Sequence, residues 1–365
     1  MSNTPKQYKT LAVAQLLGIS TDILRRAVEE SGIEIARQET GPKTRLFSID
    51  KIFDLAHYRA KRRNKNKLEL SNKQVVATIY APKGGVGKTT LAANLGTQFA
   101  LMGLRTLIID IDFQANLTLA FGYDPELTME EAAAQGVPPE SVVEHHFGNV
   151  IPEYPMTRVA LHEVIKKPYG ECGPHILPAE LELDRVDAVL TYESIQGRNS
   201  SLPIVKLMAN GQSGKDSYFD ISGYDVVLFD APPAKNRLTQ GALLASDFVI
   251  SPVSMEKFST KALSYLSSVL TQMQEDFSRS PELIIVGNFF DAARVRVQNQ
   301  LTTISQTYKD ALLDRAIRKN EDFPRALESD YDLPLTLHKP SSPATADLRE
   351  CAAALLQRMG VTDGQ

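Results

Sequence analysis

Residues 83–90 read Lys-Gly-Gly-Val-Gly-Lys-Thr-Thr. They follow an apolar, β-branched run at 74–81 and lead into a helical pattern that begins at Leu91. A strand, a glycine-rich loop and a helix in this order are typical of a phosphate-binding loop. The glycines let backbone N–H groups point at phosphate oxygens, and the helix N-terminus adds its positive dipole end. We therefore expect an α/β fold that binds a nucleoside triphosphate.

The side chains of this loop have separate expected roles. Lys88 should reach the β- and γ-phosphates, and the hydroxyl of Thr89 should ligate Mg²⁺. The loop as a whole should surround the phosphates. The expected nucleotide-binding residues in it are Lys83, Gly84, Gly85, Val86, Gly87, Lys88, Thr89 and Thr90.

The start of the loop departs from the general pattern. Pro82 stands where the ordinary motif has its first glycine, and an additional lysine, Lys83, precedes the glycines. This arrangement resembles the deviant Walker A loop of the ParA/MinD ATPases. The resemblance implies a homodimer with ATP and Mg²⁺ bound, in which Lys83 crosses the interface and contacts the phosphates of the partner subunit. A cation placed there would stabilise charge that develops on the γ-phosphate.

Two further segments fit the same family. The strand pattern at 105–116 contains Asp110 and Asp112, and it resembles the family motif Asp-x-Asp-Pro-Gln with Phe113 in the place of proline. By this resemblance Asp112 orients the attacking water, which makes it catalytic together with Lys83 and Lys88. Asp110 would support the Mg²⁺ shell. Two solvated carboxylates at a strand end are the alternative interpretation.

Residues 224–233 form an apolar run that ends in Asp230 and two prolines, which is typical of a Walker B strand. Asp230 should bind Mg²⁺ through water. Asn288 follows another apolar run, at 283–287, and the resemblance makes it a candidate contact for adenine. An amide that caps a turn is an equally good interpretation of Asn288.

The N-terminal segment has a different character, because residues 1–75 carry 15 Lys and Arg against 8 Asp and Glu while the whole chain carries 40 against 44. A short helix capped by Thr10, a turn at Gly18 and a second helix at 21–31 fit a helix-turn-helix. A hairpin around 33–48 and a further helix complete what resembles a MerR-like winged domain over residues 1–58. A small helical dimerisation domain is the alternative. The second helix should bury Ile23, Leu24, Ala27 and Val28.

Residues 59–67 contain six positive charges. We interpret 59–72 as a basic linker that either contacts DNA phosphates or stays extended by self-repulsion. The ATPase domain should then occupy 73–365, with a variable insert near 122–173. The expected DNA-binding residues are Thr21, Arg25, Arg26, Lys43 and Arg45 in the N-terminal domain and, by resemblance to the family, Arg318, Lys319, Arg325 and Lys339 near the C-terminus.

Several classes of protein are disfavoured. No apolar run is long enough to span a membrane, and no signal peptide is expected. Cys172 and Cys351 lack metal-ligand spacing, which indicates a reducing cytoplasm. His145 and His146 are adjacent and have no Cys or His partners nearby in the sequence, so we do not expect them to bind a metal.

The resemblance implies an α/β P-loop ATPase of the long ParA form, which partitions plasmid or chromosomal DNA from the cytoplasm and associates with the nucleoid. Its ATP-bound dimer would bind DNA without sequence preference, and a centromere-binding adaptor would stimulate its slow hydrolysis. The N-terminal domain would repress the protein's own promoter at an operator. The alternatives are a nucleotide-responsive transcriptional regulator without cargo and a positioning ATPase for a protein assembly.

Overall fold

Seven parallel strands form the central sheet in the order β10-β9-β8-β4-β7-β5-β6. The strands are β4 (Val75–Ile79), β5 (Thr106–Asp110), β6 (His175–Leu177), β7 (Val226–Asp230), β8 (Phe248–Ser254), β9 (Glu282–Phe290) and β10 (Leu312–Arg318). The computed structural model describes residues 6–66, 73–152, 156–197, 202–254, 260–290, 295–323 and 333–362.

The strands are continuous apolar runs because helices cover both faces of a parallel sheet. Side chains alternate between the faces, so Val75, Ala77 and Ile79 pack in one core cluster while Val76 and Tyr80 pack in the other. The prediction of an α/β fold with a parallel sheet flanked by helices is therefore confirmed.

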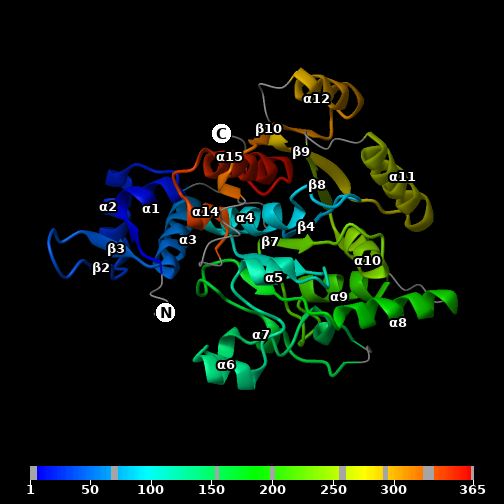
Figure 1. Cartoon of the computed structure of the whole chain (residues 1–365), viewed down its shortest axis with the longest axis horizontal. Helices are drawn as coiled ribbons and strands as arrows, with labels where there is room; N and C mark the ends of the chain where they lie inside the picture. The colour runs from blue at the N-terminus through cyan, green and yellow to red at the C-terminus, as the bar shows by residue number, and fades with distance from the viewer. Residues whose placement is uncertain are drawn as a thin grey trace.

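Figure 1 shows α4 and α15 on one side of the sheet and α8 to α10 on the other. The first layer consists of α4 (Lys88–Leu101), α14 (Leu335–His338) and α15 (Pro343–Arg358). The second layer consists of α8 (Leu183–Ile195), α9 (Leu202–Gln212), α10 (Arg237–Ala245) and α11 (Thr260–Phe277). The peripheral helices are α5 (Asn116–Ala120), α6 (Met129–Gln135), α7 (Leu161–Val164), α12 (Val295–Thr307) and the 3-10 turns η1 (Pro139–Ser141) and η2 (Phe147–Val150).

Residues 6–66 form what we call the N-terminal module. Its three short strands pair antiparallel in the order β1-β3-β2. The elements in chain order are β1 (Tyr8–Lys9), α1 (Thr10–Leu16), α2 (Thr21–Ser31), β2 (Ala36–Arg37), β3 (Arg45–Phe47) and α3 (Ile49–Asn66). The module therefore contains two helices joined by a short turn, then a hairpin, then a long helix.

Two local predictions about this module are wrong. Thr10 is the first residue of α1 rather than its cap, because Lys9 still pairs with Leu46 in the sheet and the chain passes directly from strand to helix. Ile23 is 47% exposed, whereas Leu24 is fully buried. The stripe of α2 that faces the core follows the i, i+3, i+4 positions of Leu24, and Ile23 lies outside it.

The basic run does not form an extended linker over 59–66, because α3 continues to Asn66. Ala, Lys and Arg are good helix formers, and this part of α3 packs closely against the end of α4. A Cβ atom on Gly103 would lie 2.3 Å from the Cβ of Ala60 and 2.9 Å from the carbonyl oxygen of Ala56, so only glycine allows this approach. Residues 67–72 lie outside the described part of the chain.

The N-terminal module shares a hydrophobic core with the first helical layer. Leu16 and Phe47 belong to the same cluster of buried residues as Leu348 of α15. The guanidinium of Arg349 also donates to the carbonyl of Gln15 at 2.7 Å. In Figure 1 the module accordingly lies at one end of the molecule, beside α14 and α15.

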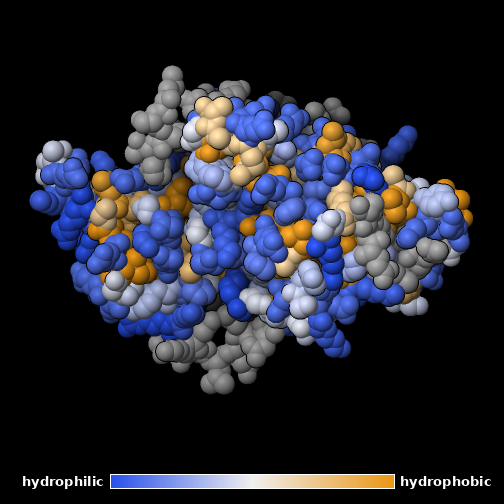
Figure 2. Space-filling model, turned by 90° about the horizontal axis from the view of Figure 1, so that it is seen from below, coloured by the Kyte–Doolittle hydropathy of each residue, from blue (hydrophilic) through white to orange (hydrophobic). Residues whose placement is uncertain are grey.

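Within the described residues, no helix combines the length and apolar character that crossing a bilayer requires. The face drawn in Figure 2 is mainly hydrophilic, with hydrophobic residues in separate small groups.

Candidate nucleotide-binding site

The phosphate loop connects β4 to α4. Gly87 has a φ of 86°, which is the left-handed region that glycine tolerates, and α4 begins at the next residue. No side chain caps the start of α4, so the N–H groups of its first turn can bind an anion. Lys88 is buried and its ammonium donates to the carbonyl of Lys83 at 3.3 Å. Burial lowers the pKa of Lys88, while Asp230 and Asp112 oppose this shift.

Asn288 supports the loop from the end of β9. Its Nδ2 donates to the carbonyl of Val86 at 2.8 Å, and its Oδ1 accepts from the N–H of Phe289 at 3.1 Å. A Cβ atom on Gly87 would lie 2.5 Å from this Nδ2, so the contact requires a glycine. Phe289 follows at a φ of 53°, and its ring lies close to Gly87 of the loop. Asn288 thus binds backbone groups in this structure, and its role toward adenine stays a prediction.

Replacing Asn288 with alanine should weaken the affinity for the Mg²⁺ complex of ATP by roughly 10-fold, because the Val86 carbonyl loses a buried donor and the loop loses its geometry. A titration with a fluorescent ATP analogue measures this. Asn236→Ala is the control, since Asn236 caps α10 through a bond of similar length to the N–H of Thr239, 2.8 Å. Equal affinities for both variants would contradict the assigned support.

The sheet brings Asp110 and Asp230 to the phosphate loop. β7 lies between β4 and β5, and Asp110 of β5 is the direct register partner of Asp230 of β7. Ile79, the last residue of β4, pairs with Asp230 on the other side. Ligands of parallel sheets bind at the carboxyl ends of strands, and three adjacent ends meet here. The three motifs that the sequence separates by up to 150 residues therefore form one site.

Asp110 anchors the turn that follows β5. Its Oδ1 accepts from the N–H of Asp112 at 3.1 Å, and its Oδ2 accepts from the N–H and the hydroxyl of Thr118 at 3.0 and 2.8 Å. Burial raises the pKa of Asp110 to about 7, and these hydrogen bonds oppose the rise. The sequence analysis missed Thr118, since no motif spacing marks a residue eight positions beyond the aspartate. With both oxygens engaged, the support that Asp110 would give to Mg²⁺ stays a prediction.

Asp230 has a different environment, although it is equally buried at 1% exposure. Among the described residues, neither of its carboxylate oxygens has a hydrogen bond of normal geometry, although the Thr89 hydroxyl lies close enough to act on it. Burial and the neighbouring Asp110 raise its pKa well above the usual range, while the Thr89 hydroxyl and the Lys88 ammonium lower it. A buried carboxylate in this position is stabilised either by a proton or by a cation or cation-bound water beside it. Thr89 and Asp230 are therefore the residues that fit a Mg²⁺ ion.

Asp112 is half-buried and close enough to Lys88 and Asp230 to act on the charge of both. Its Oδ1 accepts from the N–H of Gln114 at 3.1 Å, and its carbonyl accepts from the N–H of Ala115 at 2.8 Å. Ala115 closes this turn at a φ of 50°. The turn therefore forms with Phe113 in place of proline, and Phe113 packs against the second core cluster.

The predicted DNA-binding residues of the N-terminal module lie on and near α2. Thr21 is the first residue of α2, and Arg26 and Lys43 are exposed. Arg25 pairs with Asp22 at 3.1 Å, and Arg45 pairs with Glu29 at 3.7 Å. The Arg25 pair is exposed and therefore weak, so a phosphate can compete for Arg25, whereas the Arg45 side chain is only 21% exposed.

Two of the C-terminal candidates are held by buried carboxylates. Arg318 binds Asp347 with two guanidinium contacts, of 2.8 Å through Nε and 2.6 Å through Nη2. The ammonium of Lys339 donates to Asp322 at 2.5 Å. Both pairs connect segments that are distant in sequence, so these cations have a structural contact besides any role on DNA. Lys319 is exposed, and Arg325 lies outside the described residues.

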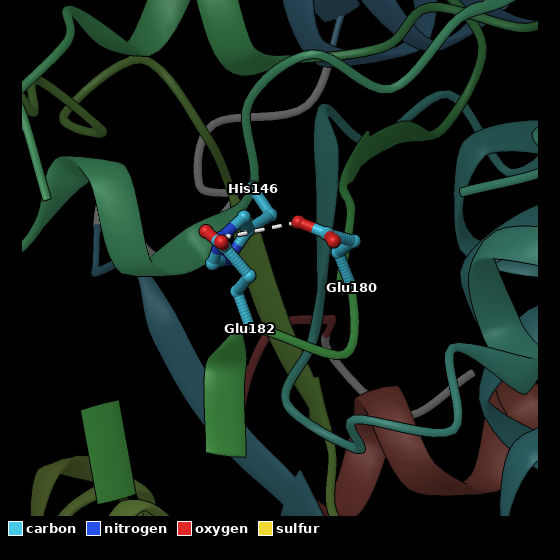
Figure 3. A group of neighbouring side chains, drawn as sticks. All are labelled: His146, Glu180 and Glu182. Atoms are coloured by element: carbon cyan, nitrogen blue, oxygen red, sulfur yellow. Dashed lines mark ion pairs between the residues drawn. The ribbon is translucent and has the colours of Figure 1, made fainter. Parts of the chain in front are cut away.

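A second polar cluster follows β6 at the same end of the sheet. Figure 3 shows Glu180 and Glu182 beside His146, whose Nε2 lies 3.6 Å from Glu180. The Nδ1 of His146 accepts from the N–H of Gly148 at 3.2 Å, which places the proton of the neutral ring on Nε2. Burial lowers the pKa of His146 to about 4, so the ring is neutral near pH 7. The Nε2–H then points at the carboxylates, and this tautomer opposes metal ligation.

The sequence of this chain is similar to a known family and to known proteins. A family model described as an AAA domain (AAA_31) matches residues 74–284. The chain is 26% identical over 281 residues to the chromosome-partitioning ATPase Soj of Treponema pallidum, covering 76% of this chain and 95% of that protein. It is 30% identical over 260 residues to a putative replication protein A of Sinorhizobium fredii, covering 67% of this chain and 56% of the relative.

Solved structures share the fold at lower identity. A cobyrinic acid a,c-diamide synthase of Mycobacterium smegmatis, with an ATP analogue and magnesium, is 21% identical and covers 78% of this chain and 96% of its own, with a TM-score of 0.59. A structure described as a putative plasmid partition protein of Borrelia burgdorferi, bound to AMPPNP, is 21% identical and covers 78% of this chain and 100% of its own, with a TM-score of 0.57.

One further structure, described as a partition protein, is 17% identical with a TM-score of 0.57 and covers 93% of its own chain. Its match extends over 99% of this chain and so includes the N-terminal module. The phosphate loop, both carboxylate-bearing strands and part of β9 lie within the range that the family model matches. The chain belongs to the AAA domain family AAA_31.

Proposed function

We propose that this chain is a ParA-type ATPase that partitions or positions a cargo on DNA. The observation that carries the proposal is the meeting of the Lys83–Thr90 loop with the unpaired carboxylate of Asp230. Similarity to a chromosome-partitioning ATPase supports it. The diamide synthase and the plasmid partition structure are each 21% identical to this chain, so both support the fold alone.

Lys88 and the N–H groups of the first turn of α4 would bind the phosphates, while Thr89 and Asp230 would hold Mg²⁺. The ion would neutralise charge on the β- and γ-phosphates. Lys83 is partly exposed on the loop, where a lysine can reach a partner subunit. In an ATP-bound homodimer it would complete the site of the other subunit.

Asp112 would orient the attacking water, because it is half-buried beside Lys88 and its backbone N–H is held by Asp110. Replacing Asp112 with alanine should lower ATP turnover by about 100-fold or more, while the affinity for ATP changes little. Turnover assays and nucleotide titrations on the same preparation separate the two quantities. Turnover at the wild-type rate would remove the role of Asp112.

The N-terminal module would act as a winged helix-turn-helix. α2 would be the reading helix, with Arg25 and Arg26 exposed along it, and the β2–β3 hairpin would be the wing, with Lys43 at its tip. Arg318, Lys319, Arg325 and Lys339 would contact DNA without sequence preference in the ATP-bound dimer. An adaptor protein bound to the cargo would stimulate hydrolysis and release the dimer from nucleoid DNA.

The anisotropy of a labelled random-sequence duplex, titrated with protein plus ATP–Mg²⁺, ADP–Mg²⁺ or no nucleotide, tests this proposal. We expect tight binding with ATP–Mg²⁺ alone, weakening steeply with salt. Equal binding in all three states would place the DNA contact in the N-terminal module and favour a transcriptional regulator. A positioning ATPase for a protein assembly would give the expected result too, and only its adaptor would distinguish it.

A further inference from the structure

We infer that Thr336 in α14, together with Tyr8 in the N-terminal module, positions the phosphate loop and thereby sets its nucleotide affinity. The inference rests on the proposed nucleotide binding. It assigns a function to two residues that lie outside every nucleotide motif, and Thr336 is 242 residues beyond Asn94, its partner in α4.

The first step is a buried contact between α14 and α4. Both the N–H and the hydroxyl of Thr336 donate to the Oδ1 of Asn94 at 2.9 Å. The hydroxyl of Thr336 also accepts from the Nε2 of Gln98 at 3.2 Å. Thr336, Asn94 and Gln98 are all at most 1% exposed, so water cannot replace these partners.

The second step runs from Asn94 into the phosphate loop. With its oxygen held by two donors from Thr336, the amide of Asn94 can present only its NH₂ group to the helix. That group donates to the carbonyl of Thr90 at 2.8 Å. Thr90 is in the first turn of α4, directly after the magnesium-binding candidate Thr89. The orientation of one buried amide thus connects α14 to the residues that bind phosphate.

The N-terminal module contacts the backbone of α14 from the other side. The hydroxyl of Tyr8 donates to the carbonyl of Leu337 at 2.6 Å, and the ammonium of Lys6 donates to the carbonyl of His338. Tyr8 is 3% exposed and belongs to β1 of the N-terminal module. The position of α14 therefore depends on the docked module, and the order of the network is module, α14, α4 and loop.

A second contact links the same segment to the opposite side of the loop. Lys339, directly after α14, pairs with Asp322, and the adjacent Phe323 packs edge-on against Phe289 with ring centroids 5.8 Å apart. A Cβ atom on Gly87 would lie 3.1 Å from the ring of Phe289. The segment from α14 to Lys339 thus touches the supports on both sides of the loop, which a purely local packing contact would not do.

The network is tested on the full chain with a fluorescent ATP analogue and Mg²⁺. Thr336→Val removes the hydroxyl and keeps the shape, while Thr336→Ser restores the hydroxyl. Tyr8→Phe removes the hydroxyl at the module. Tyr224→Phe is the matched control. The hydroxyl of Tyr224, just before β7, makes a 2.7 Å contact with His175, the first residue of β6, away from the loop.

We expect Thr336→Val and Tyr8→Phe each to weaken nucleotide affinity on the order of 3- to 10-fold, as coupling through packed networks does. Thr336→Ser and Tyr224→Phe should keep the wild-type affinity. The double variant Tyr8→Phe, Thr336→Val should lose less than the product of the single losses, since both act on one path. Urea unfolding of each variant separates affinity from stability.

If Thr336→Val and Tyr8→Phe bind the nucleotide as tightly as the wild type and lose only stability, the contacts are structural and the inference is overturned. The same loss in Tyr224→Phe would also overturn it, because the effect would then follow any buried hydroxyl. A wild-type chain that binds no nucleotide would overturn the proposed function as well, which keeps the two failures distinguishable.

Discussion

Replacing Lys88 with alanine should reduce the affinity for the Mg²⁺ complex of ATP by about two orders of magnitude, and hydrolysis should disappear with it. Lys88 is 8% exposed, and its ammonium has one long contact, to the carbonyl of Lys83 at 3.3 Å. Truncating one partner of a buried charge pair is expensive, because the phosphate charge then has no cation opposite it. The fold should survive, since burial already lowers the pKa of Lys88 and penalises the charged ammonium.

The matched variant is Lys83→Ala, which removes a lysine from the same loop. If Lys83 acts on the partner subunit, this variant should bind nucleotide like the wild type and lose turnover and dimerisation. A titration with a fluorescent ATP analogue and a sedimentation measurement distinguish the two lysines. Wild-type affinity in Lys88→Ala would refute the assignment of this loop to phosphate.

Replacing Asp230 with asparagine should have effects of opposite sign on stability and on activity. Without Mg²⁺ the chain should become more stable by roughly 1–2 kcal/mol, because a buried carboxylate with no donor is replaced by a neutral amide. Turnover with ATP–Mg²⁺ should fall by about 100-fold or more, since a neutral amide is a poor substitute for the carboxylate beside the ion.

Asp225 provides the control on the same strand segment. Its Oδ2 accepts from the N–H of Arg105 at 2.7 Å and its Oδ1 from the Arg105 guanidinium at 3.2 Å. Asp225→Asn should therefore reduce stability, in contrast to Asp230→Asn. Urea unfolding of both variants with and without Mg²⁺ measures the difference. If the Asp230→Asn variant unfolds more easily than the wild type without Mg²⁺, then the carboxylate is stabilised by its neighbours in the folded protein, and this explanation is wrong.

The sequence predicted well those elements whose conformation depends on residues close to them in the chain. The loop at 83–90 needs glycines and a following helix, and both requirements are met within a few residues, so α4 follows the loop as predicted, although it begins at Lys88 rather than at Leu91. The apolar runs that end in Asp110 and Asp230 form β5 and β7 for the same reason.

Predictions failed where a neighbour distant in sequence decided the outcome. The basic run at 59–66 is helical, with Ala60 packed on Gly103, whereas its charges alone predicted a linker that either contacts DNA or stays extended. Asn288 donates to the carbonyl of Val86, a contact that no sequence motif indicates, and its contact with adenine stays a prediction. Thr118 carries no sequence signal, because only the folded turn places it against Asp110.

By itself the sequence determined that this protein has a phosphate loop, two strands that end in carboxylates and a basic N-terminal segment, because each depends on backbone preferences within about ten residues. Only the tertiary structure decided that β7 lies between β4 and β5, that Asp230 is buried without a donor, and that Thr336 contacts Asn94. These features follow from strand order and side-chain packing across the whole chain, which local periodicity does not encode.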